Sequence, residues 1–163
     1  MKRMRCGLRL MLLVTLATGT AYAQSRASAP APLQGAWRIV EVTTTAQATP
    51  VAMSQPSLYL FTARHFSFVA VSSQDPRPTP ENPASVTGAE ALAVWGPFMA
   101  QSGTYEATGT TLTVRPLVAK NPSAMAGGQT TYAYKLEGNN LTLTVEQNGA
   151  GTMGAVARLV RVE

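Results

Sequence analysis

Cysteine and histidine are nearly absent from this 163-residue chain, which holds one of each, Cys6 and His65. The lone cysteine excludes an internal disulfide, so stability must come from an ordinary hydrophobic core. One histidine with dispersed carboxylates does not make a zinc or iron site. We therefore predict no metal and no cofactor.

Catalytic motifs are also missing: there is no Gly-rich phosphate loop, nucleophile elbow or paired-carboxylate motif. A catalytic His65 would need an orienting partner and a nucleophile within hydrogen-bond reach. The one aspartate, Asp75, lies in a neighbouring proline-rich loop. The sequence predicts a protein that is not an enzyme, with His65-based catalysis as the least favoured alternative.

Long apolar runs are limited to Leu10–Ala17, which follows a basic start and precedes the small-x-small tripeptide Ala21-Tyr22-Ala23. This order of segments is typical of a secretory signal peptide. We predict that residues 1–23 are removed, leaving Gln24 first. The run is too short to span a bilayer stably. The mature chain is thus expected to lack a transmembrane segment and to be periplasmic or secreted.

Charge is sparse once that segment is set aside. Four of the 13 Lys and Arg residues lie in the first nine positions, which leaves nine basic residues against eight acidic ones, a net charge of +1. The nine are scattered singly, whereas nucleic-acid binding needs a dense basic stripe. We predict neither nucleic acid nor an anionic membrane as a partner.

Residues 24–32 are rich in alanine, serine and proline and predict a flexible leader. Residues 33–163 predict one all-β domain, because segments with period-two apolar alternation follow one another. Eight strands are expected, at Ala36–Thr44, Ser57–Phe61, Phe66–Val71, Gly103–Ala107, Thr111–Leu117, Thr130–Glu137, Leu141–Gln147 and Ala155–Val162.

A loop and one short helix interrupt the strands. Residues 72–85 contain four prolines, which cannot join a sheet interior. Thr87 and Glu90 have the spacing of a capping box, which predicts a helix over Gly88–Trp95. We expect this helix to act as a plug or lid at one end of the domain.

Eight mostly sequential antiparallel strands predict a closed up-and-down barrel, because closure removes exposed sheet edges. A barrel of this size is either filled by its own side chains or admits one small ligand.

The tripeptide Gly35-Ala36-Trp37 at the start of the first strand resembles the Gly-x-Trp entry of lipocalins and other calycins. In those folds a basic residue near the end of the last strand packs across the tryptophan and closes the barrel floor. The resemblance implies that Gly35 and Trp37 are structural. Arg158 and Arg161 are the candidates for the basic residue, with Arg161 preferred.

Three blocks, 58–68, 103–107 with 117–122, and 134–143, resemble bacterial exported lipocalin-like proteins without an assigned function. The likeness covers residues 33–163 and implies a calycin-type barrel. The chain departs from true lipocalins in lacking their usual disulfide cysteines and in carrying the proline-rich insert and helix.

Aromatic side chains have two interpretations, a filled core or a ligand cavity anchored by tyrosine hydroxyls. His65 is either a half-exposed turn residue or a ligand contact. The candidate ligand-binding residues are Tyr59, Phe61, His65, Phe66, Phe68, Trp95, Tyr105, Tyr132 and Tyr134. The leading prediction is non-catalytic binding or carriage of a small, mostly apolar ligand. The alternative is an inhibitor or interaction module that engages an envelope protein through its loops, 72–85 and 119–129.

Overall fold

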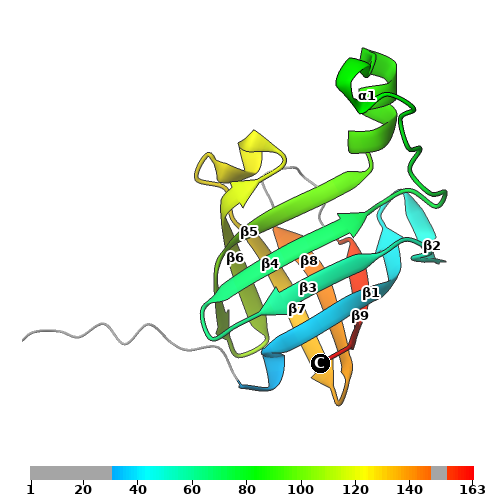
Figure 1. Cartoon of the computed structure of the whole chain (residues 1–163). Helices are drawn as coiled ribbons and strands as arrows, with labels where there is room; N and C mark the ends of the chain where they lie inside the picture. Colours follow the sequence, from blue (N-terminus) through cyan, green and yellow to red (C-terminus); the bar gives the residue numbers. More distant parts are fainter. Residues whose placement is uncertain (1–30, 148–153) are drawn as a thin grey trace, which may run out of the picture.

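The chain folds as a closed antiparallel barrel (Figure 1). The computed structural model describes residues 31–147 and 154–163. The predicted signal peptide, residues 1–23, and residues 24–30 of the predicted leader lie outside the described residues. A short 3₁₀ turn, η1 (Ala31–Leu33), leads into the first strand.

Eight strands make the barrel wall: β1 (Gly35–Thr44), β3 (Ser57–Phe61), β4 (His65–Val71), β5 (Phe98–Thr108), β6 (Thr111–Ala119), β7 (Thr130–Glu137), β8 (Asn140–Gln147) and β9 (Val156–Arg161). Each pairs antiparallel with the next, and β9 returns to β1 in a register that runs from Trp37↔Arg161 to Thr43↔Val156. The predicted eight-stranded up-and-down barrel is confirmed. The largest boundary error is in β5, which begins five residues before the predicted Gly103.

A ninth strand, β2 (Gln47–Ala52), was not expected from the sequence. The first part of β1 pairs with β3 over Gly35–Trp37, and its last part pairs with β2 over Glu41–Thr44. β2 thus pairs with the stretch of β1 that β3 does not reach. Its sequence contains a proline and has no apolar alternation, which explains why the pattern missed it.

The two ends of the barrel differ. The tight turns at 62–64, 109–110 and 138–139 lie at one end, which we call the floor, together with the C-terminus (Figure 1). The longer connections 72–97 and 120–129 lie at the other end, which we call the mouth. The connection 120–129 includes the short 3₁₀ turn η3 (Pro122–Met125).

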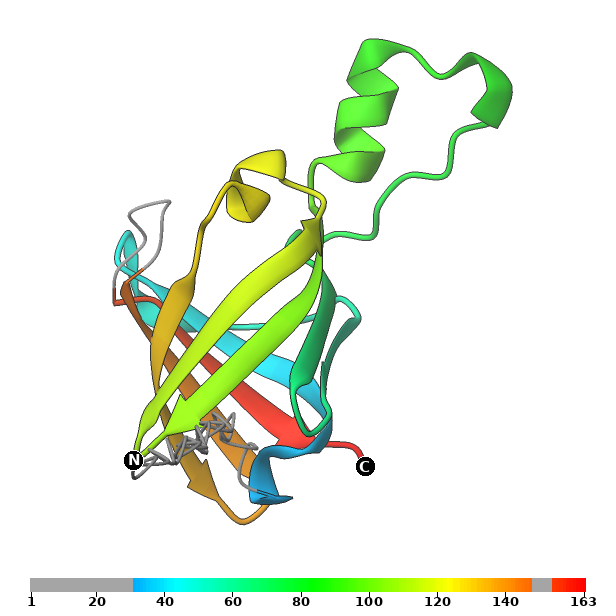
Figure 2. The ribbon, with the colours of Figure 1, turned by 90° about the vertical axis from the view of Figure 1, so that its left-hand side faces the viewer.

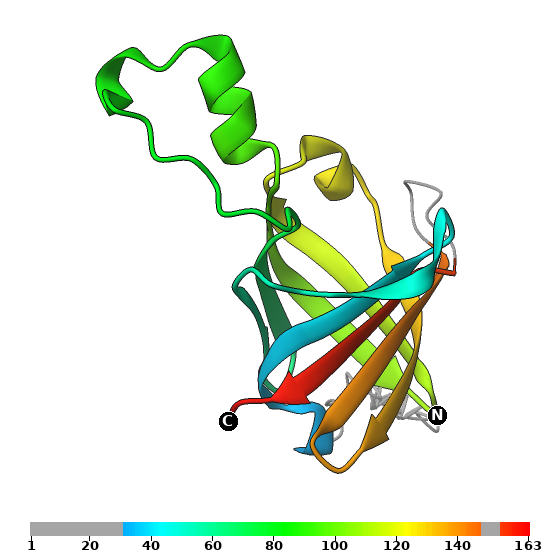
Figure 3. The same ribbon diagram turned by 90° about the vertical axis from the view of Figure 1, so that its right-hand side faces the viewer.

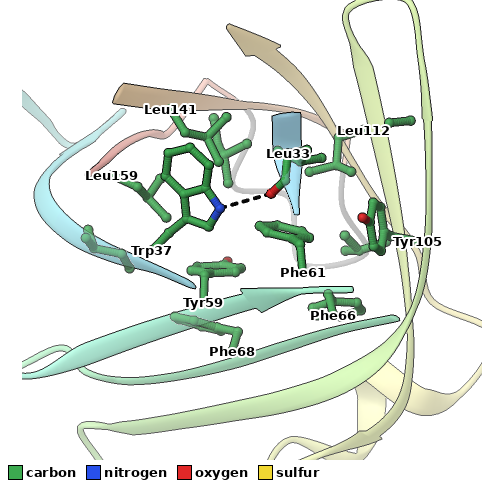
Figure 4. Close-up of a cluster of buried hydrophobic side chains, with 14 of the residues drawn as sticks. Leu33, Trp37, Tyr59, Phe61, Phe66, Phe68, Tyr105, Leu112, Leu141 and Leu159 are labelled. Carbon is green, nitrogen blue, oxygen red and sulfur yellow. Dashed lines mark hydrogen bonds between the residues drawn. The ribbon is translucent and has the colours of Figure 1, made fainter. Parts of the chain in front are cut away.

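The floor half of the barrel is filled by a core of buried apolar side chains (Figure 4). The largest fully buried members are Trp37, Leu33, Leu112, Leu141, Leu143, Leu159 and Val114. Phe61 meets Tyr105 edge-on at 5.1 Å between ring centroids. The core residues of the strands alternate with more exposed ones and so lie on one inner face of the sheet. Burial of that face drives closure of the barrel.

Trp37 and Arg161 close the floor. The indole of Trp37 is fully buried, and its Nε1 donates to the carbonyl of Leu33 at 3.0 Å (Figure 4). The Arg161 guanidinium lies over the indole ring at 4.1 Å and donates to the Gln34 carbonyl at 2.7 Å. Gly35 has φ 129°, and a Cβ there would lie 2.6 Å from the Arg161 Nη1. The same Cβ would lie 2.6 Å from the backbone carbonyl oxygen of Glu163, and this contact together with the positive φ requires glycine at position 35.

Arg158, the other candidate from the sequence, is not at the floor contact. Its side chain is 64% exposed and forms an ion pair with Glu41 at 3.5 Å. Strand alternation explains the difference, because Arg158 is adjacent to the inward-facing Leu159 and must point outward.

Helix α1 (Gly88–Trp95) begins with the predicted capping box, in which Thr87 accepts from the Glu90 amide at 3.3 Å. The prediction that it plugs the barrel is wrong. The helix has no buried residue, and three views show it standing clear of the barrel beyond the β4–β5 end (Figures 1, 2 and 3). Leu92 and Trp95 remain 72% and 57% exposed. No helix within residues 31–147 or 154–163 has the length and apolar character needed to cross a membrane.

Candidate functional site: a cavity at the mouth of the barrel

The mouth half of the barrel is not filled by its own side chains. A cavity of about 780 Å³ opens there, between β4–β7 and the loop that joins β6 to β7. This volume lies within the range of small-molecule sites, roughly 300–1,000 Å³. The barrel is therefore packed at the floor and hollow at the mouth.

Strand register explains which side chains line the cavity. Phe68 of β4 lies opposite Gln101 of β5, and Gln101 lies opposite Ala119 of β6. Directly opposed residues share a face of the sheet. Two residues nearer the floor, Phe66 opposite Gly103, belong to the same inner face and are buried. The cavity is thus a continuation of the core toward the mouth.

Tyrosine hydroxyls lie beside the cavity. Tyr132 lines it, and Phe68, also in the lining, stacks on Tyr59 at 4.3 Å between ring centroids. Burial raises the pKa of Tyr59 well above its usual value, and the neighbouring Tyr132 hydroxyl raises it further. Burial also raises the pKa of Tyr132. Both hydroxyls are therefore neutral hydrogen-bonding groups at physiological pH.

Apart from Lys120, the other polar lining groups are also uncharged. Gln101, Gln129 and Thr130 contribute amides and a hydroxyl. Asn121 accepts from the backbone amide of Ser123 at 3.1 Å and from its hydroxyl at 2.9 Å, so these two loop residues partly satisfy each other. No Asp, Glu, Arg or His lines the cavity in the described part of the chain.

Lys120 is the one charged residue in the lining. Its ammonium donates to the carbonyls of Gly96 at 3.0 Å and Phe98 at 2.8 Å, and also to that of Trp95. These carbonyls follow the C-terminal end of α1, where a cation is favourable. An ammonium has three protons, and three carbonyls accept them. Lys120 is thus committed to anchoring the α1–β5 junction.

Arg77 anchors the same junction from the proline-rich loop. Its Nη1 donates to the Val94 carbonyl at 3.3 Å, and its guanidinium lies 5.1 Å from the centroid of the Phe98 ring. The helix is therefore held beside the mouth through its C-terminal end alone, consistent with its exposed flanks.

The predicted ligand-binding residues divide into three groups. Phe68 and Tyr132 line the cavity, and Tyr59 lies against Phe68. Four others belong to the buried core or pack against it, and they do not line the cavity: Phe61, Phe66, Tyr105 and Tyr134.

Two of the predicted ligand-binding residues, His65 and Trp95, do not line the cavity. His65 is exposed beside the floor turn, at the end opposite the mouth. It points outward because the adjacent Phe66 points inward. Trp95 is exposed and meets Phe98 edge-on at 5.9 Å. It therefore lies outside the lining, although Gly96 and Phe98 contribute to it.

Sequence reasoning missed Met99, Gln101, Ala119 and Thr130, which line the cavity. The start of β5 shows no apolar alternation, because Gln101 and Gly103 interrupt the inner face and Phe98 and Ala100 are apolar on the other face. The expected strand therefore began only at Gly103. Within the described residues there is also no group of three His, Cys, Asp or Glu side chains able to hold a metal ion.

No family model and no curated protein sequence matches the chain. Among solved structures, it is similar to a lipocalin-like protein from Bacteroides uniformis, with a TM-score of 0.49 and 16% identity over 80% of this chain and 98% of that one. It is also similar to an uncharacterized protein from Bacteroides eggerthii, with a TM-score of 0.44 and 12% identity over 78% and 98%. The strand order and closure of this chain define an eight-stranded antiparallel up-and-down barrel.

Proposed function

We propose that this protein binds and carries a small, mostly apolar molecule in the mouth cavity, without catalysis. The observation that supports this most is the contrast between the two halves of one inner face. The floor half holds the largest fully buried side chains, whereas the mouth half has an open-sided cavity of about 780 Å³. Phe68 and Met99 line this cavity and do not fill it. Apolar side chains that line an open cavity favour a site that a ligand fills.

Binding in the cavity can be tested with N-phenylnaphthylamine, a neutral apolar dye that fluoresces when it leaves water. Ala119→Phe adds a ring to the lining, and we expect it to weaken dye binding at least about tenfold, since it removes cavity volume. Val118→Phe is the matched control, because Val118 is 60% exposed and does not line the cavity. Equal binding by both variants and the unmodified protein would place the dye elsewhere.

We further propose that the carrier acts outside the cytoplasm, in the periplasm or beyond. The support is the sequence of residues 1–23, with its basic start, apolar run and small-x-small site. The intact mass of the protein recovered from the cells that make it tests this. We expect a chain beginning at Gln24; a chain retaining residues 1–23 in the cytosolic fraction would contradict it.

A second candidate function is protein interaction, with α1 as the contact element. It is favoured by one observation, the exposure of Leu92 and Trp95 on a helix that has no buried residue. A photo-crosslinker placed at position 92 in producing cells would then form a discrete protein adduct. The same crosslinker at position 158, on the barrel wall, is the control. Identical patterns at both positions would argue against this candidate.

A further inference from the structure

Among the described residues, Lys120 is the one charged side chain in the cavity lining. The rest of the polar lining consists of amides and hydroxyls, with Gln101 and Tyr132 on the inner face of β5 and β7 and Thr130 beside them. The ligand can therefore be recognised by hydrogen bonds from neutral groups, while apolar contact comes from Phe68 and Met99.

The one cation in the lining is already engaged. The Lys120 ammonium donates to backbone carbonyls at the end of α1, so a carboxylate or phosphate would have to compete with these carbonyls for its N–H groups. The carbonyls at the end of α1 also offset part of its charge. A ligand anion would have to displace these contacts and detach the α1–β5 junction.

We infer that the mouth cavity selects an uncharged ligand, an apolar molecule whose polar groups are hydroxyl, carbonyl or amide rather than an ionised acid. This inference rests on the proposed function, because it names the class of ligand for the same cavity. The physical reason is desolvation: an anion that enters the cavity loses its water and finds no free charged partner. The raised pKa values of Tyr59 and Tyr132 agree with an environment that disfavours negative charge.

The test compares two dyes that differ by one group. Anilinonaphthalene sulfonate is N-phenylnaphthylamine with an added sulfonate, which stays ionised at all working pH values. We expect the neutral dye to bind at least about tenfold more tightly than the sulfonate at the Ala119-sensitive site, since a tenfold ratio is a modest penalty for an unpaired charge. Only binding that Ala119→Phe removes is counted.

A charge introduced into the lining should change this selectivity. Gln101→Lys places an ammonium on the inner face beside Phe68, and we expect it to strengthen sulfonate binding about tenfold while weakening the neutral dye. Val118→Lys is the matched control, because it adds the same charge on the opposite face of the neighbouring strand. It should leave both affinities unchanged.

The outcomes separate the two proposals. If the neutral dye does not bind, the carrier function fails and the ligand class fails with it. If both dyes bind equally at the Ala119-sensitive site, or the sulfonate binds more tightly, the cavity is a binding site but the selection of uncharged ligands is wrong. We expect the neutral dye to bind more tightly than the sulfonate. We expect Gln101→Lys to reverse this order of affinities and Val118→Lys to leave it unchanged.

Discussion

Replacing Arg161 by methionine should loosen the barrel floor, because this residue joins β9 to β1 and to the segment before it. The guanidinium lies 4.1 Å from the centroid of the Trp37 ring, and it donates to the half-buried Gln34 carbonyl at 2.7 Å. It also donates to the Pro32 carbonyl and, at 3.4 Å, to that of Glu163, which are both exposed contacts.

The expected loss can be estimated from these contacts. A cation lying over a buried indole contributes about 1 kcal/mol. The charged hydrogen bond to the Gln34 carbonyl contributes about another 1 kcal/mol, and the exposed contacts contribute little. We therefore expect Arg161→Met to lower the free energy of unfolding by about 2 kcal/mol, which for a domain of this size corresponds to a Tm decrease of roughly 7 °C.

Arg158→Met is the matched control, since it removes the same charge from the same strand. Arg158 is 64% exposed and has one ion pair, so its loss should cost no more than about 0.5 kcal/mol. Urea unfolding followed by tryptophan fluorescence measures both variants. Lysine at position 161 should be intermediate, because it keeps the charge but loses the planar guanidinium. If Arg161→Met and Arg158→Met were equally stable, the floor contact would not have the role assigned to it.

Two further predictions concern stability. Gly35→Ala should destabilise the fold by about 2 kcal/mol or more, because φ 129° is strained for alanine and the Cβ has no room; Gly88→Ala, with nothing within 4 Å, is its control, and equal unfolding midpoints would refute the argument. Burial raises the pKa of the Tyr59, Tyr132 and Tyr105 side chains, and that of Tyr105 reaches about 12. The pKa of tyrosine in an unfolded chain is about 10. The stability that these side chains contribute is therefore complete below that pH, and it is lost as the pH rises toward their pKa values in the folded protein. Thermal unfolding recorded between neutral pH and strongly alkaline pH should show Tm falling from about pH 10, and a Tm that is constant through this range would contradict it.

The fold was predictable from the sequence because its signal is repeated along the chain. Strands such as 111–117 and 141–147 alternate apolar and polar residues, and the turns between strands fall at Gly109 and Gly138, with φ 59° and 58°. Strands such as these two bury one face, so local alternation and global closure point to the same structure. The short, proline-containing β2 and the start of β5 lack this alternation and were missed.

The candidate site was harder to predict, because core and cavity share one face. Phe66 and Phe68 are both inward and aromatic, and only the depth of each in the barrel decides that the first is packed and the second lines a cavity. Depth depends on where the strands end and on how the loops at the mouth fold, which no periodicity encodes. The predicted position of α1 as a plug was wrong for a similar reason. Its capping box determines where the helix begins and not what it packs against.

Native mass spectrometry of the protein, purified without detergent from the cells that produce it, tests the central claim most directly. The account predicts a reproducible additional mass, lost on denaturation, that is present in the unmodified protein and in Val118→Phe but absent from Ala119→Phe. A ligand-free mass for all three proteins, unchanged after incubation with a neutral lipid extract of the same cells, would contradict the claim that the mouth cavity is a binding site.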